Sequence, residues 1–103
     1  WTFSVDPSDA NVMYLGAVNF YRSLDGGATW TTQVNGTGDG GVHVDQHDST
    51  VSRANPNIFF LANDGGIWRT DNAKAATIPW VNLNQTLNTV QFQGVAMHPT
   101  NPD

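Results

Sequence analysis

The chain repeats itself at an interval of 46 residues. Residues 6–11 align with residues 52–57 and again with residues 98–103, so both offsets are 46 (57 − 11 and 103 − 57). The segments that follow, 11–16 and 57–62, also match. Each copy consists of short β-branched and aromatic segments separated by turn residues, a pattern typical of strands and not of helices. The repeat therefore predicts a four-stranded β unit that occurs about twice.

The spacing of apolar segments and turn residues places the strands within each unit. No segment shows a helical period, and the chain contains no Glu, a residue that helices favour. We name the strands A to D from the inner edge of each unit outwards. The first unit is expected to have strands at 1–5, 11–17, 19–24 and 30–34, the second at 42–51, 57–63, 66–71 and 79–84, and a third strand A at 89–97.

A turn motif lies between the third and fourth strands of the first unit, where the sequence fits Ser-x-Asp-x-Gly-x-Thr-Trp. The side chains of Ser23 and Asp25 can fold back onto N–H groups of the turn. Gly27 can adopt a positive φ that a Cβ would penalise. Thr29 completes the pattern, and Trp30 opens the next strand and can cover the turn. The motif therefore predicts a tight turn closed by its own side chains.

This motif resembles the Asp box of the bacterial neuraminidase repeat (BNR) family. The family includes sialidases, xyloglucan-active glycosidases and sortilin-type receptors, all of which are β-propellers. The resemblance implies an all-β fold of four-stranded antiparallel propeller blades, with about two repeats of a larger β-propeller in this chain. It also implies that the Asp box is structural and lies on the face away from an active site.

The repeat divides the chain into three parts. Residues 1–41 are expected to form blade one, with a partial strand A, the Asp box at 23–30 and a D–A loop at 35–41. Residues 42–88 are expected to form blade two, and residues 89–103 to start a third blade. A propeller closes with about 4–8 blades. We therefore expect further blades, from a longer chain or from other copies of this one.

The charge and composition restrict the partners. The chain has 4 Lys and Arg residues against 9 Asp residues, a net charge of −5. Nucleic acids and anionic membranes require clustered positive charge, so neither is an expected partner. There are no cysteines, which excludes disulfide and thiolate sites. The high content of Asn, Thr, Asp and Gly is typical of a turn-rich protein that is secreted or at the cell surface.

Three ionisable side chains alternate at the start of blade two. His43, Asp45 and His47 occupy positions i, i+2 and i+4, which share one face of a strand. They can form a polar ladder along a channel, contact a glycan, or bind a divalent metal ion. Alternate side chains of a strand start about 7 Å apart and chelate poorly. We therefore expect no cofactor, and metal binding by these three residues is the weakest alternative.

A second polar cluster, Asn63 and Asp64, lies in the B–C turn of blade two and precedes two glycines. In a propeller the D–A and B–C connections lie on one face, so this turn and His43 are expected to share the face on which ligands bind. Trp68 follows the turn and is either a platform for sugar stacking or a core residue. The candidate ligand-binding residues are therefore His43, Asp45, His47, Asn63, Asp64 and Trp68.

Two classes of function fit these features. The first is a secreted BNR-repeat propeller module that binds a glycan or a protein partner on the face of the D–A and B–C loops. The second, implied by the resemblance, is a glycoside hydrolase of the xyloglucanase-like propeller type, with Asp45 and Asp64 as candidates for its paired aspartates. A sialidase is less well supported for two reasons. The chain contains no Glu. In addition, its three arginines, Arg22, Arg53 and Arg69, are expected away from the pocket.

Overall fold

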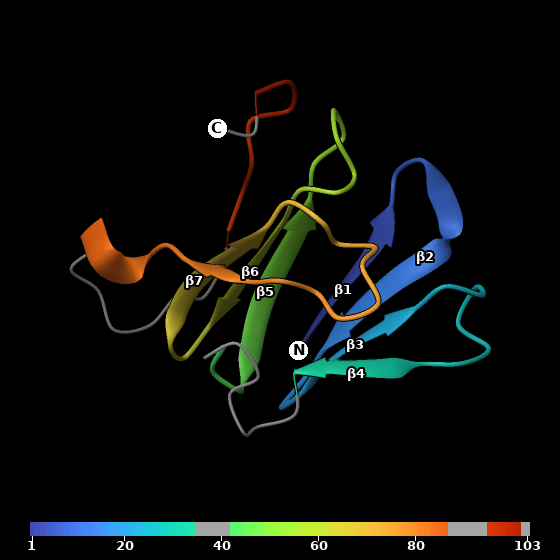
Figure 1. Cartoon of the computed structure of the whole chain (residues 1–103), viewed down its shortest axis with the longest axis horizontal. Helices are drawn as coiled ribbons and strands as arrows, with labels where there is room; N and C mark the ends of the chain where they lie inside the picture. The colour runs from blue at the N-terminus through green and yellow to red at the C-terminus, as the bar shows by residue number, and fades with distance from the viewer. Residues whose placement is uncertain (35–41, 87–94, 102–103) are drawn as a thin grey trace.

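The computed structural model describes residues 1–34, 42–86 and 95–101. The predicted loop 35–41 and residues 89–94 of the predicted third strand A lie outside the described residues. Two antiparallel four-stranded sheets lie side by side (Figure 1). The first sheet contains β1 (Thr2–Asp6), β2 (Asp9–Gly16), β3 (Phe20–Ser23) and β4 (Thr31–Val34). The second contains β5 (Gln46–Val51), β6 (Phe59–Asn63), β7 (Gly66–Thr70) and β8 (Val81–Asn82), followed by a 3₁₀ helix, η2 (Asn84–Thr86).

Strands that follow one another in the sequence are neighbours in each sheet, in the orders β1-β2-β3-β4 and β5-β6-β7-β8. The prediction of four-stranded antiparallel units is therefore confirmed. Three predicted bounds are wrong. The second strand A begins at Gln46 and not at residue 42, the second strand D is limited to Val81–Asn82, and residues 95–97 are not in a strand.

The innermost strands of the two sheets, β1 and β5, are in contact. The hydroxyl oxygens of Thr2 and Ser4 lie 2.9 and 2.8 Å from Oγ of Ser49. An equivalent contact occurs one repeat later, where the N–H of Val95 donates to Oδ2 of Asp48 at 2.8 Å. Asp48 lies 46 residues after Thr2, and Val95 lies 46 residues after Ser49. The contact between successive units is therefore itself repeated.

An apolar core fills the space between the two sheets. Alternate residues of a strand point to the same face, so Tyr14 of β2, Phe20 of β3 and Phe59 of β6 meet there. The ring centroids of Tyr14 and Phe59 are 4.5 Å apart, and those of Phe20 and Phe59 are 5.5 Å apart. The ring of Trp80 packs edge-on against Phe20 at 5.7 Å. Burying one such side chain contributes about 1.5–3 kcal/mol, so this cluster is the main attachment between the sheets.

The two sheets approach each other closely at Gly16, the last residue of β2. A Cβ at this position would lie 2.7 Å from Cγ2 of Thr2 and 2.8 Å from Cβ of Gln46, closer than Cβ atoms approach in real structures. Because Gln46 opens the second sheet, glycine at this position lets the start of β5 pack directly onto β2.

Polar side chains of the first sheet hold the loop between β7 and β8 of the second. Buried Arg22 donates from Nη1 to the carbonyl oxygens of Ala73 and Ala75 at 2.8 and 2.5 Å. The carboxylate of Asp6 lies 2.8 Å from Nζ of Lys74, and the Asp6 side chain has no exposed surface. Burial disfavours the charged form of Asp6, but hydrogen bonds from Lys74 and from its own turn outweigh burial and lower its pKa. The loop is thereby fixed against the first sheet.

The turn between β3 and β4 is closed by its own side chains. The Asp25 carboxylate accepts hydrogen bonds from the Ser23 hydroxyl (2.8 Å), the Thr29 N–H (2.8 Å) and the Thr29 hydroxyl (2.5 Å). The hydrogen bonds from Thr29, with the one from Ser23, lower the pKa of Asp25 to about 2. Gly27 has a φ of 92°, and its carbonyl oxygen accepts a hydrogen bond from the Trp30 indole at 3.0 Å. These are the turn contacts expected from the motif.

Tyr14→Phe should stabilise the protein. The Tyr14 hydroxyl is buried and has no hydrogen-bond partner among the described residues. Burial, together with the charge of Asp6, raises its pKa to about 12. The equivalent residue of the second sheet, 46 positions later, is Phe60. Removing a buried hydroxyl without a partner is expected to raise the free energy of unfolding in urea by about 1 kcal/mol.

The matched control is Tyr21→Phe, because the Tyr21 hydroxyl accepts a hydrogen bond from Asn19 at 3.1 Å. This second variant should be less stable than the unmodified protein. A Tyr14→Phe variant that loses stability to the same extent would contradict the expectation.

Asp25→Asn should destabilise the protein near neutral pH and much less in acid. The pKa of about 2 lies below the ordinary value of 3.8. The stabilising contribution of the carboxylate is therefore complete above about pH 4 and is lost as the pH falls towards 2. Urea unfolding midpoints of both proteins at pH 7 and pH 2 measure this difference. Asp9→Asn, at the exposed start of β2, controls for the loss of one negative charge. A difference in stability between the two proteins that is the same at pH 7 and pH 2 would contradict this stabilising role of the Asp25 carboxylate.

Candidate functional site

The residues that lead into β5 do not extend the strand. Asp45 has a φ of 62°, a left-handed conformation that interrupts an extended backbone. The N–H groups of Asp45 and Gln46 donate to carbonyl oxygens in the β2–β3 turn of the first sheet, at 2.9 and 2.7 Å. The register between β5 and β6 then shifts directly after Gln46. This shift leaves His47 as the extra residue of a β-bulge.

The prediction that His43, Asp45 and His47 project from one face of a strand is therefore wrong. The left-handed residue and the bulge each break the alternation on which that prediction depended. His43 is exposed, and its Nδ1 lies 2.9 Å from the carbonyl oxygen of Val44. Within the parts of the chain that the structure describes, no group of three or more His, Cys, Asp or Glu side chains is placed to hold a metal ion.

Asn63, which was expected to contact a ligand, is fully buried. Its Nδ2 donates to the carbonyl oxygen of His43 at 2.9 Å and to Oε1 of Gln46 at 3.2 Å. Its Oδ1 accepts hydrogen bonds from the Gly65 N–H at 2.9 Å and the Trp68 indole at 3.2 Å. Trp68 is only 5% exposed, which makes it a core residue and not a platform for sugar stacking. The structure thus corrects the ligand-binding role of both residues, and Asn63 instead connects the entry of β5 to the β6–β7 turn.

The structure brings His47 and Asp64 together. Nε2 of His47 is hydrogen-bonded to Oδ1 of Asp64. His47 comes from the bulge of β5 and Asp64 from the β6–β7 turn, and these two segments lie at the same end of the second sheet (Figure 1). The side chains are 23% and 36% exposed, so a ligand can reach both.

The turn that carries Asp64 is fixed on both sides. Gly66 has a φ of 109°, a conformation that suits glycine. The Asn84 side chain covers the turn, where its Nδ2 donates to the Gly65 carbonyl oxygen and its Oδ1 accepts from the Ile67 N–H, both at 2.8 Å. A backbone held in this way presents the carboxylate in a defined position, as binding sites require.

The pair combines a carboxylate with an imidazole, groups that bind hydroxyls and transfer protons. Asp45 is half-buried at the same end of the sheet. The first sheet has Trp1 and Val18 at the positions equivalent to His47 and Asp64, 46 residues earlier. The pair is therefore not required by the architecture that the two sheets share.

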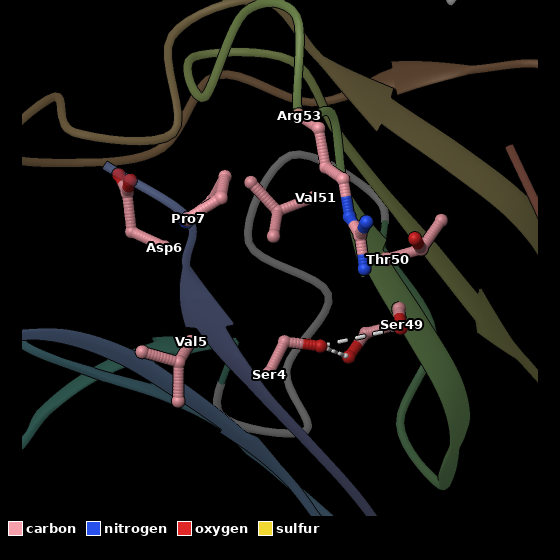
Figure 2. A pocket seen from close by; sticks show the side chains of 8 residues that line it. All are labelled: Ser4, Val5, Asp6, Pro7, Ser49, Thr50, Val51 and Arg53. Atoms are coloured by element: carbon pink, nitrogen blue, oxygen red, sulfur yellow. Dashed lines mark hydrogen bonds between the residues drawn. The ribbon is translucent and has the colours of Figure 1, made fainter. Parts of the chain in front are cut away.

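The structure also contains an open groove of about 600 Å³ between β1 and β5, which was not predicted (Figure 2). Ser4, Ser49, Thr50 and Arg53 are among the residues that line it. A signal for this feature was present in the sequence, since Arg53 replaces the proline of the other two copies.

None of the helices within the described residues is long and apolar enough to cross a membrane.

No family model matches the chain, and no curated protein matches it. Among solved structures, the chain is similar to an ancestral GH74 enzyme, with a TM-score of 0.55 and 16% sequence identity. The alignment covers 69% of this chain and 11% of the enzyme, so the chain spans about a tenth of that enzyme's length. A likeness at this level of identity shows the fold and not the activity. Together with the two antiparallel four-stranded sheets, it shows that the chain has a propeller-type fold.

Proposed function

We propose that the chain forms blades of a secreted BNR-repeat propeller, which binds a glycan at the end of the second blade that carries His47 and Asp64. The observation that carries this proposal is the partly exposed, hydrogen-bonded pair formed by these two side chains. Carboxylate and imidazole groups form directional hydrogen bonds with sugar hydroxyls. A protein partner at the same end is the alternative ligand.

The turn between β3 and β4 supports the BNR assignment. In this proposal it is an Asp box, with Asp25 as its central acceptor and Gly27 and Trp30 closing the turn. Its role is structural, because the Asp25 carboxylate is already engaged by Ser23 and Thr29.

The proposal also requires further blades. Phe3 and Val5, on β1, are apolar but 50% and 39% exposed. At the other side, Val95, which belongs to the next copy of the repeat, is hydrogen-bonded to Asp48. Propellers close with about 4–8 blades. We propose that further four-stranded sheets, from a longer chain or from other copies, cover these surfaces. Residues 1–41 and 42–88 would then be two blades, and residues 89–103 the start of a third.

A glycoside hydrolase of the xyloglucanase-like propeller type is the second candidate. The likeness in fold to a GH74 enzyme favours it. Such an enzyme needs two carboxyl groups whose separation sets the stereochemical course of the reaction. Asp64 and Asp45 are the candidates, and the hydrogen bond with His47 would orient Asp64 for proton transfer.

Asp64→Asn should weaken glycan binding. Calorimetric titration of the variant and of the unmodified protein with a panel of β-glucan and xyloglucan oligosaccharides measures the two binding affinities. Losing a hydrogen bond to a charged group costs about 1.5–3 kcal/mol, so binding should fall by at least about tenfold. His47→Gln should also reduce the affinity for these oligosaccharides. Asp71→Asn, which removes an exposed carboxylate beyond the far end of β7, is the matched control and should bind like the unmodified protein.

Hydrolysis of the same panel separates the two candidates. Turnover that is lost in both Asp45→Asn and Asp64→Asn would establish the hydrolase and overturn the non-catalytic module. Binding without turnover would exclude the hydrolase. A folded protein that neither binds nor hydrolyses any member of the panel would contradict both.

A further inference from the structure

The groove between β1 and β5 lies at the opposite end of β5 from His47. Its volume of about 600 Å³ is typical of sites for small ligands. Ser4 and Ser49 contribute hydroxyl groups to its walls, and these two hydroxyls lie 2.8 Å apart. The side chain of Thr50, the next residue of β5, faces the other side of the strand. The Arg53 side chain extends from the residues after β5 along the groove towards Thr50 (Figure 2). The groove therefore offers two hydroxyls and one cation.

Arg53 is available to a ligand. Arg22 donates to backbone carbonyls, and Lys74 and Arg69 pair with carboxylates. Arg53 is exposed, and no hydrogen bond or ion pair joins it to another described residue. The Asp6 carboxylate, which belongs to the same groove, has no exposed surface and is already paired with Lys74. Among the described residues that line the groove, no acidic group therefore competes for the Arg53 guanidinium.

The repeat indicates that the turn itself does not need this arginine. Pro7 and Pro99 occupy the equivalent positions, 46 residues before and after Arg53. A second groove of about 340 Å³, which Thr50 and Val95 help to line, repeats the first groove one unit further and also includes Arg53. One guanidinium thus stands between two equivalent grooves, at a position where the other two copies have no charge.

We propose that the groove between β1 and β5 binds a hexuronic acid, and that Arg53 recognises its carboxylate. The guanidinium group can form two parallel hydrogen bonds with a carboxylate. The hydroxyls of Ser4 and Ser49 can exchange hydrogen bonds with sugar hydroxyls beside it. Because the chain has a net charge of −5, an anion is repelled from most of its surface and binds where a local cation offsets that repulsion. This site is separate from the one formed by His47 and Asp64.

Titration with sodium glucuronate at neutral pH and constant ionic strength, followed by ¹H–¹⁵N NMR spectra, tests the proposal. Saturable shifts are expected for the amide signals of Ser49 and Thr50 and for the Nε–H signal of Arg53. Arg53→Gln should weaken binding by at least about tenfold, because it removes charged hydrogen bonds. Arg69→Gln removes the same charge outside the groove and should leave binding unchanged.

Two further ligands and one further variant complete the test. Glucose lacks the carboxylate and acetate lacks the sugar hydroxyls, so both should bind more weakly than glucuronate. Equal binding of acetate and glucuronate would mean an adventitious anion site only and would overturn the proposal. Glucuronate binding that survives Arg53→Gln, or the absence of any saturable shift, would also overturn it. Arg53→Pro, which introduces the residue found in the other two repeats, should lose binding while retaining the turn.

Discussion

The structure depends on the packing of one four-stranded sheet against the next. A sheet with an apolar face must bury that face against another element, and here Tyr14 and Phe20 of the first sheet meet Phe59 of the second. The polar contacts at the edge of this core have a different role. Arg22 and Asp6 are buried, and buried charges are tolerated only when they are paired or hydrogen-bonded. Both side chains bind the β7–β8 region of the second sheet, so they help to fix the alignment of the two sheets.

This alignment also positions the candidate site. The β2–β3 turn of the first sheet accepts hydrogen bonds from the backbone N–H groups of Asp45 and Gln46, which holds the entry of β5 in place. Buried Asn63 then connects that entry to the β6–β7 turn through its side-chain amide. As a result, His47 and Asp64 meet at one end of the second sheet. The geometry of this pair therefore rests on contacts within the second sheet and on the neighbouring sheet as well.

The sheets and the β3–β4 turn could be predicted, because alternating apolar residues and turn residues recur at a fixed interval and act locally. The errors arose where distant contacts decide the conformation. Nothing in the sequence near Asp45 indicates that its N–H bonds to another sheet, so the left-handed conformation that separates His43 from His47 was not foreseeable. The burial of Trp68 likewise follows from the packing between the sheets. Arg53 was visible as a departure from the repeat, but only the neighbouring strand shows that it borders a groove.

The contact of Thr2 with Ser49 recurs as that of Asp48 with Val95. When units join through the same positions at a constant interval, each unit is rotated relative to the previous one by a similar angle, and the curvature of the whole array follows from that single step. Small changes in spacing at this contact would accumulate from unit to unit. In the proposed ring, the side chains along β1 and β5 would therefore influence how many units complete the circle, a property that no individual sheet possesses.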